Sequence, residues 1–256
     1  MPNRPIARAA LALLAACGAA ACGTQEAPDP LAPTGPTGRV RLVNVITDTT
    51  RGRVNAILEG VPFGVNLTYG LSTPATLPAP STAPYAPIYA GSRTLVLRRT
   101  ADTAVVVATL PFTVDAAQDR TVYAVGGRGG TPVTAFVTTD DNSVPTAAQA
   151  RVRLVNLSPT AGAVDLFVTA AGAELATATP TAANLAVQGT SAYVTLPAGT
   201  YQVRAVPAGT PAASRAASVS INLASTALGG GAVRTIVAAD NNVGGAPLRL
   251  FVLADN

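Results

Sequence analysis

Apolar and polar residues alternate along most of the chain beyond residue 38, which is the period of a strand with one buried face. At the start of this region, Val40 and Leu42 lie on one side of such a strand and Arg41 on the other. Similar short runs follow, separated by Gly, Pro, Asn and Asp residues that favour turns. We therefore predict strands at 53–58, 64–69, 94–98, 104–109, 121–125 and 133–138, and then at 151–157, 163–169, 174–178, 192–196, 201–206, 218–223, 234–239 and 248–253.

Alanine is abundant and is the strongest helix former, but it does not build a helical pattern here. Beyond the N-terminal leader, apolar residues do not recur at i, i+3, i+4 and i+7 without an interrupting Gly or Pro. The stretch 72–87 breaks the rhythm of strands, because its prolines exclude a helix and a central strand alike. It is predicted to be a long surface loop in an otherwise all-β chain.

The chain contains the same plan twice. The hexapeptide Arg-Val-Arg-Leu-Val-Asn occurs at 39–44 and again at 151–156, and later blocks correspond in the same order, such as 120–122 with 234–236. A repeated set of short alternating strands is typical of tandem β-sandwiches. We predict a first β-sandwich module at 39–142, a linker at 143–150 and a second module at 151–256.

The N-terminus has the features of a secretion signal. A short basic region is followed by an apolar run at 9–16 that is too short to span a bilayer. The run ends in Leu-Ala-Ala-Cys, which resembles the lipobox of bacterial lipoproteins and implies a lipid on Cys17; Cys22 follows a weaker version of the pattern, and a plain secretory signal is the alternative. Residues 1–16 are thus expected to be a lipoprotein signal peptide, and the Ala-, Pro- and Gly-rich stretch 17–38 a flexible tether.

The net charge argues against nucleic acid as a partner. The formal charge is +4, and removal of a leader that contains Arg4 and Arg8 leaves 15 arginines against 13 acids, or +2. The one moderate basic cluster consists of Arg39, Arg41, Arg51 and Arg53, which we expect on the solvent face of strands.

Catalytic chemistry is restricted by composition. The chain has no histidine, and Cys17 and Cys22 are its only cysteines, so a Ser/His/Asp triad, a Cys/His pair and a zinc site of histidines are excluded. Asp165 lies in a predicted strand and has Asn55 as its counterpart in the first copy, which favours a hydrogen bond to the backbone over general acid catalysis. We predict no catalytic residue, cofactor or metal.

Two further groups could be sites or turns. Asp140, Asp141, Asp240 and Asp255 stand beside asparagines near strand ends and offer oxygen ligands for calcium, but their spacing matches no calcium loop, so turns are favoured. The glycine-rich stretch 126–130 leads into Pro132 and a strand rather than a helix, which favours a hairpin turn over a phosphate-binding loop.

Four blocks of the second copy resemble the bacterial family called domain of unknown function 4397. They are 151–156, Ala-Val-Asp-Leu-Phe-Val at 163–168, the stretch 193–203 and Arg-Thr-Ile-Val at 234–237; the first copy matches more weakly. The resemblance implies secreted or surface-anchored β-sandwich domains without an established activity. The Pro-Ala-Gly-Thr-Tyr stretch at 197–201 is also similar to the corner of prealbumin-like repeats, which implies immunoglobulin-like or prealbumin-like sandwiches.

These observations predict a lipid-anchored, extracytoplasmic protein of the bacterial cell envelope, in the periplasm or at the cell surface. Its expected role is non-catalytic binding, adhesion or support, with the membrane and an envelope glycan or protein as partners. The alternatives are a glycoside hydrolase that uses only carboxylates and a carrier of an apolar ligand in a cleft between the modules. The second module is expected to fold alone, with Tyr201 packed in its core and hydrogen-bonded to the backbone, whereas Arg93 stands at the matching position of the first.

Overall fold

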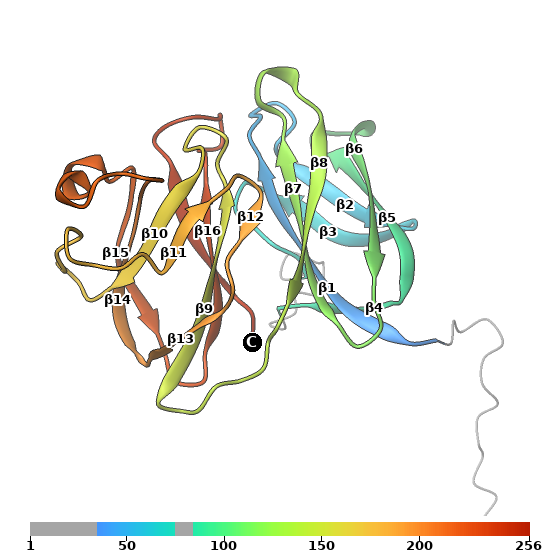
Figure 1. Ribbon diagram of the computed structural model, residues 1–256. Coiled ribbons are helices and arrows are strands. Elements are labelled where there is room, and N and C mark those ends of the chain that lie inside the picture. The colour runs from blue at the N-terminus through green and yellow to red at the C-terminus, as the bar shows by residue number, and fades with distance from the viewer. Residues whose placement is uncertain (1–34, 75–83) are drawn as a thin grey trace, which may run out of the picture. The chain divides into compact units, whose positions relative to one another are not determined.

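Regular structure in the part of the chain that the computed structural model describes, residues 35–74 and 84–256, consists of strands and three single-turn 3-10 helices (Figure 1). The N-terminal half contains β1 (Thr37–Ile46), β2 (Val54–Leu58), β3 (Val61–Leu67), β4 (Ala86–Tyr89), β5 (Gly91–Arg99), β6 (Asp102–Val114), β7 (Asp119–Gly126), η1 (Arg128–Gly130) and β8 (Val133–Asp140). The C-terminal half contains β9 (Gln149–Leu157), β10 (Val164–Thr169), β11 (Ala182–Leu185), β12 (Gly189–Thr190), β13 (Val194–Pro197), β14 (Gly199–Pro207), η2 (Ala212–Ser214), η3 (Ala216–Ser218), β15 (Ile221–Leu228), β16 (Val233–Ala239) and β17 (Arg249–Ala254). The predicted all-β class is confirmed, and within the described ranges no helix is long and apolar enough to cross a membrane.

The strands form four sheets, and the two halves use the same connections. In the N-terminal half the sheets have the orders β4-β1-β7-β8 and β3-β2-β5-β6; in the C-terminal half they have the orders β12-β9-β16-β17, with β13 also paired to β9, and β11-β10-β14-β15. The hexapeptide strand of each half, β1 or β9, pairs in parallel with β7 or β16. The repeat in the sequence is therefore a repeat of strand topology.

Each half has its own hydrophobic core between its two sheets. In the N-terminal half, Val40 and Leu42 of β1 are fully buried in one cluster with Leu95 and Leu97 of β5. The C-terminal half builds a corresponding cluster that includes Val152 and Leu154 of β9 and Val203 of β14. Burial of one such aliphatic side chain is worth about 1.5–3 kcal/mol, so each pair of sheets has a substantial source of stability.

A third cluster joins the two halves through the outer faces of their hexapeptide sheets. It contains Val43 and Tyr123 from one half and Val155 and Val237 from the other, all fully buried. As a result, β1 is buried at every position from Val40 onward rather than at alternate positions. The prediction of a strand with one solvent face was wrong for β1 and β9, because both of their faces are covered.

Three other local predictions need correction or fall outside the described residues. The stretch 174–178 is a turn and not a strand, and Leu175 packs beside Phe167. The predicted surface loop 72–87 contains buried Thr73 and Tyr85 and ends in β4, which pairs with β1; residues 75–83 are not described. The predicted signal peptide, most of the tether and the lipidation site Cys17 also lie outside the described residues.

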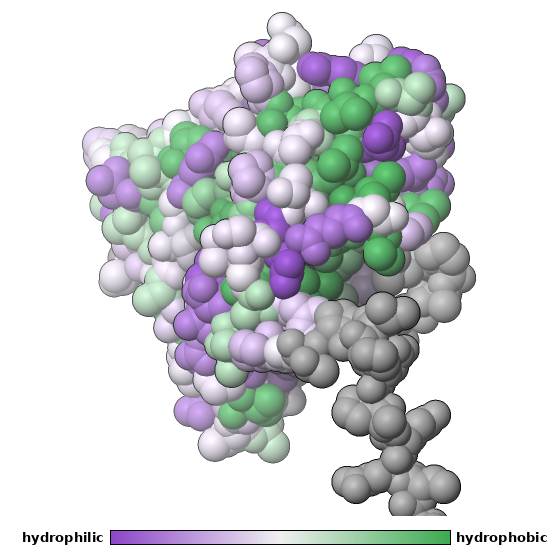
Figure 2. Space-filling model, turned by 90° about the vertical axis from the view of Figure 1, so that its right-hand side faces the viewer, coloured by the Kyte–Doolittle hydropathy of each residue, from purple (hydrophilic) through white to green (hydrophobic). Residues whose placement is uncertain are grey.

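Hydrophobic side chains remain exposed on the side of the molecule that carries β5 and β6. Figure 2 views this side and shows hydrophobic residues interrupted by hydrophilic ones. Val106 of the edge strand β6 is 48% exposed and is paired with Arg98 of β5, whose Nη1 donates to the Thr103 carbonyl at 2.8 Å. Charged residues beside an exposed edge strand discourage the addition of a further strand.

Candidate functional site

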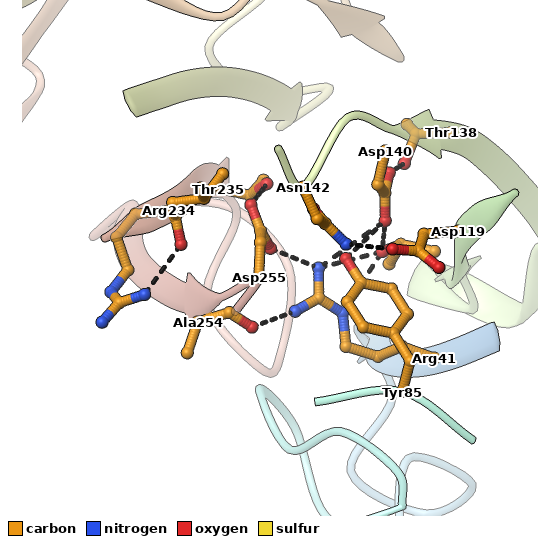
Figure 3. A network of polar contacts seen from close by, with 12 residues as sticks. Arg41, Tyr85, Asp119, Thr138, Asp140, Asn142, Arg234, Thr235, Ala254 and Asp255 are labelled. Atoms are coloured by element: carbon orange, nitrogen blue, oxygen red, sulfur yellow. Dashed lines mark hydrogen bonds and ion pairs between the residues drawn. The ribbon is translucent and has the colours of Figure 1, made fainter. Parts of the chain in front are cut away.

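The second arginine of each hexapeptide is the most unexpected residue of the fold. Arg41 was predicted, by alternation, to face solvent, but it is only 1% exposed, as is Arg153 at the same position of the second hexapeptide. They lie where the hexapeptide sheets of the two halves meet, and Figure 3 shows Arg41 among side chains from both ends of the chain. A buried charge is costly unless it is paired and fully hydrogen-bonded, so these contacts decide what the cluster can do.

Arg41 reaches from the N-terminal half into the C-terminal half. Its Nε and Nη2 donate to Oγ1 of Thr121 on the neighbouring strand, at 3.2 and 2.9 Å. Its Nη1 donates to the carbonyl oxygen of Ala254 at 2.6 Å, and Nη2 also donates to Oδ1 of Asp255 at 2.7 Å. The guanidinium thus ties β1 to the last strand of the other half.

Arg153 makes the same contacts in the opposite direction. Its Nε donates to Oγ1 of Thr235 at 2.8 Å, the counterpart of Thr121. Its Nη1 donates to the carbonyl oxygen of Thr139 at 3.0 Å, and Nη2 donates to Oδ1 of Asp140. Each half therefore inserts one arginine into the other half and binds the arginine of the other half with its own aspartate.

The two carboxylates are saturated by donors of their own half as well. Asp140 accepts hydrogen bonds from Thr121, from Thr138 Oγ1 at 2.8 Å and from the Tyr85 hydroxyl at 2.7 Å. Asp255 accepts from Thr235 Oγ1 at 2.7 Å and from the Tyr193 hydroxyl at 3.4 Å. These hydrogen bonds hold each carboxylate in the orientation in which it binds the arginine of the other half.

Two tyrosine rings complete the arrangement. The guanidinium of Arg41 lies 4.6 Å from the ring centre of Tyr85, and that of Arg153 lies 5.0 Å from the ring centre of Tyr193. Burial raises the pKa of both tyrosine hydroxyls, with nearby carboxylates acting in the same direction, so both stay neutral donors. Neither tyrosine was assigned a role from the sequence, although Tyr193 opens the stretch 193–203.

The electrostatic balance of this cluster explains why it tolerates burial. Burial lowers the pKa of Arg41 and of Arg153, but the neighbouring aspartates and tyrosines outweigh it, and the pKa of each guanidinium lies above its ordinary value. Two positive and two negative charges are thus paired across the boundary. Carboxylates held in this way lack the free, solvent-accessible oxygen that acid–base catalysis requires.

The four aspartates assigned to turns fall into two groups. Asp140 and Asp255 are not turn residues but buried ion-pair partners, and that assignment was wrong because their partners are distant in sequence. Asp141 accepts from the Ser143 backbone N–H at 3.1 Å, which is a turn contact. Asp240 is buried, and it accepts from the Gly245 backbone N–H at 2.8 Å and from Thr160 Oγ1 at 2.7 Å.

The remaining candidates have structural contacts. Asp165 accepts the backbone N–H of Asn184 at 2.7 Å, and Asn55 accepts that of Asn66 at 2.8 Å. The two donor residues, Asn184 and Asn66, have positive φ and lie beside an irregular strand pairing. The predicted backbone hydrogen bond is therefore confirmed and has the same role in both copies. The stretch 126–130 connects the antiparallel strands β7 and β8, as predicted for a hairpin.

A metal site and a site for an apolar ligand are the remaining alternatives. Among residues 35–74 and 84–256, no group of three or more Asp, Glu, His or Cys side chains is placed to hold a metal ion. A hollow of about 340 Å³ lies between the halves, lined mainly by small and aliphatic residues such as Val125, Leu157 and Val187, together with Arg128 and Asp240. Its walls contain neither Tyr nor Phe, whose rings would favour a carrier of an apolar ligand.

Comparisons with known proteins identify a family, whereas the similarity to solved structures is low. A family model described as domain of unknown function (DUF4397) matches residues 38–167, which spans β1 to β10, whereas the residue blocks had placed the stronger likeness in the second copy. No curated protein matches. Among solved structures, the family CBM26 module CBMbc of Eubacterium rectale Amy13K, in complex with maltoheptaose, is 8% identical with a TM-score of 0.26, covering 84% of this chain and 96% of that one. A leucine-rich repeat protein from Bacteroides thetaiotaomicron is 14% identical with a TM-score of 0.19, covering 78% and 26%. Neither score supports an argument about fold or function.

Proposed function

The chain belongs to the family described as domain of unknown function (DUF4397), and from that premise we propose that it is a lipid-anchored protein of the cell envelope with a non-catalytic binding or structural role. In this proposal each half is an immunoglobulin-like or prealbumin-like sandwich, and the pair is carried outside the cytoplasm on a tether that begins at Cys17. The tandem sandwiches act as one rigid body that presents its surface to envelope components.

One observation carries the non-catalytic part of the proposal, namely the reciprocal exchange of Arg41 and Arg153. An enzyme that closes on its substrate needs a hinge, whereas this exchange places two buried ion pairs and their hydrogen bonds across the boundary between the halves. It also occupies Asp140 and Asp255, the carboxylates that converge most closely on one group, so a glycosidase with this pair as acid and base has no support.

The anchor is tested by fractionation. Cys17→Ala is expected to move the protein from the membrane fraction to the soluble fraction and to abolish labelling with a radioactive fatty acid, because no thiol remains for acylation. Cys22→Ala is the matched control and should leave both measurements unchanged. A Cys17→Ala protein that stays labelled and membrane-bound would refute the lipoprotein proposal.

The non-catalytic role is tested with the segment 35–256, which forms one compact unit. Immobilised protein is expected to retain envelope polysaccharide or protein from a detergent extract, and it should release no reducing sugar from the retained glycan over many hours. Release of reducing ends that disappears in Asp140→Asn would show a hydrolase instead. Retention of lipid alone would favour the carrier.

A further inference from the structure

A second hollow between the halves has a different character from the apolar one. Its volume is also about 340 Å³, and its walls come from the loop after β1, the end of β3 and the hairpin β16–β17. The residues that matter here are Arg53, Thr68 and Tyr69 from the N-terminal half and Asn242 and Arg249 from the C-terminal half. It therefore exists only because the two halves are held together.

The two arginines of this hollow are unlike every other arginine of the described ranges 35–74 and 84–256. Each of the others donates a hydrogen bond to a carbonyl, hydroxyl or carboxylate of the protein. Within the same ranges Arg53 and Arg249 donate none and form no ion pair, and both are exposed. Two guanidinium groups with all their donors free thus line one hollow.

Asp48, the carboxylate in the wall of this hollow, does not neutralise Arg53 and Arg249. Asp48 lines the same wall, but its Oδ2 accepts a hydrogen bond from Nε of Arg51 at 2.6 Å, and its Oδ1 accepts from Thr50. That carboxylate is already matched by its own arginine. Arg53 and Arg249 therefore leave the hollow with two uncompensated positive charges.

The apolar hollow provides an internal comparison, because it is built from the matching strands of the opposite halves. Tyr69 and Val187 occupy matching positions in the two halves. The backbone N–H of Gly70, which follows Tyr69, donates to the Asn44 carbonyl, and that of Gln188, which follows Val187, donates to the Asn156 carbonyl. The pairing of β16 with β17 and of β7 with β8 also places Arg249 and Thr134 at matching positions. The arginine of the apolar hollow, Arg128, lies 3.8 Å from the Asp240 carboxylate and donates to Thr160. The unpaired arginines and the aromatic ring are therefore peculiar to one hollow and are not demanded by the shared fold.

We infer that this hollow is a binding site for a negatively charged saccharide. The anionic group would lie between Arg53 and Arg249, whose planar guanidinium groups suit bidentate contact with a carboxylate. The side chains of Thr68 and Asn242 offer donors and acceptors for sugar hydroxyls. The ring of Tyr69, held by its hydroxyl on the Asp240 carbonyl and packed against Phe251, provides an apolar wall. The inference rests on the proposed binding role and names its ligand class and its site.

Isothermal titration of the segment 35–256 with trigalacturonate tests the site, with cellotriose as the neutral sugar and inorganic phosphate as the simple anion. Trigalacturonate is expected to bind and cellotriose not. Arg53→Gln and Arg249→Gln should each weaken trigalacturonate binding about tenfold, as expected for loss of a charged hydrogen bond, and the double variant should show no binding. Arg128→Gln, in the apolar hollow, is the matched control and should stay within about twofold. Raising the salt concentration should weaken binding by the native protein.

The outcomes separate this inference from the broader proposal. Equal affinity for phosphate and trigalacturonate would overturn the saccharide assignment, and unchanged binding in the double arginine variant would overturn the site. Absence of trigalacturonate binding while envelope material is still retained overturns the inference and leaves the binding role standing. Retention of envelope material that survives in the double arginine variant would likewise place that binding elsewhere on the protein.

Discussion

Arg41 and Asp255 stand 214 positions apart in the chain, yet Nη2 of the arginine lies 2.7 Å from Oδ1 of the aspartate. The first strand of the described fold is thereby bound to its penultimate residue. The same relationship, reversed, joins Arg153 to Asp140. Removal of one member leaves a buried charge without its partner, which is the most damaging change that this kind of contact permits.

Arg41→Gln is therefore expected to lower the free energy of unfolding of residues 35–256 by about 3–5 kcal/mol. Arg39→Gln is the control two positions away, because its ion pair with Asp119 is exposed on the arginine side, and it should cost at most about 1 kcal/mol. Urea denaturation of both variants measures the difference. Equal losses would mean that the buried exchange adds no more than a surface ion pair.

A double-mutant cycle tests whether the pair acts as a unit. Asp255→Asn alone should destabilise the fold, because Arg41 then keeps its charge without its closest carboxylate. The double variant Arg41→Gln with Asp255→Asn should be more stable than the sum of the single losses predicts, since no unpaired charge remains at that position. Strict additivity would argue against direct coupling.

Tyr123→Phe is expected to leave stability unchanged or to raise it by up to about 1 kcal/mol. The Tyr123 side chain is fully buried at the boundary of the halves, and its hydroxyl has no hydrogen-bond partner among the described residues. Removal of an unsatisfied buried hydroxyl relieves a desolvation cost. A loss of more than about 1 kcal/mol, measured by denaturation, would show that the hydroxyl is bonded after all.

The same tyrosine predicts a response to alkali. Burial raises the pKa of Tyr123 to about 12, partly opposed by Arg41 and Arg153, whereas an unfolded tyrosine titrates near pH ~10. The folded state thus holds its proton when the unfolded state releases it, so this contribution is complete below pH ~10 and is lost as the pH rises toward 12. Stability measured across this window should fall less steeply in Tyr123→Phe than in the native protein. Parallel curves would mean that Tyr123 ionises equally in both states.

The separated C-terminal half gives a further test. The sequence predicted that residues 148–256 fold alone, but separation exposes Val155 and Val237 and leaves Arg153 and Asp255 without partners. Since both arginine and carboxylate remain on this half, two copies can exchange them about a two-fold axis. We expect a concentration-dependent dimer by light scattering, and a monomer for Arg153→Gln. A stable native monomer at high concentration would contradict this.

The corner at Gly199, where β14 begins, gives another prediction. The Tyr201 hydroxyl donates to the Pro197 carbonyl at 2.7 Å, as predicted, and its ring is partly buried. Arg93 holds the matching corner, because its Nε donates to the Tyr89 carbonyl at 2.9 Å. Tyr201→Phe should cost about 1 kcal/mol through the lost hydrogen bond, and Tyr201→Ala more, through lost packing as well. Denaturation of the full segment 35–256 measures both; equal values would assign the whole effect to the hydroxyl.

The sequence predicted what depends on neighbours in the chain. Alternation located most strands, and the repeated hexapeptide marked the first strand of each half. The equivalence of Asp165 and Asn55 in the two copies indicated a local hydrogen bond to the backbone. Alternation failed at Arg41, because a strand covered on both faces has no solvent side and only a charged partner makes the burial of an arginine tolerable. Asp140 and Asp255 were misassigned for the same reason, since their partners come from the other half. The hollow of Arg53 and Arg249 likewise gave no local signal, because its walls are distant in sequence.

The parallel pairing of β1 with β7 determines how the molecule responds to mechanical load. Eight residue pairs, from Arg39 with Asp119 to Ile46 with Gly126, lie side by side along the whole of β7 and along β1 from Arg39 onward. A pull on Thr37 along β1 therefore acts on these hydrogen bonds in shear, so that they share the force, whereas a perpendicular pull would open them one at a time. Arg41 adds a charged link from the loaded strand to β17. A chain held by its N-terminal end against flow or a moving ligand would thus resist extension at its first strand.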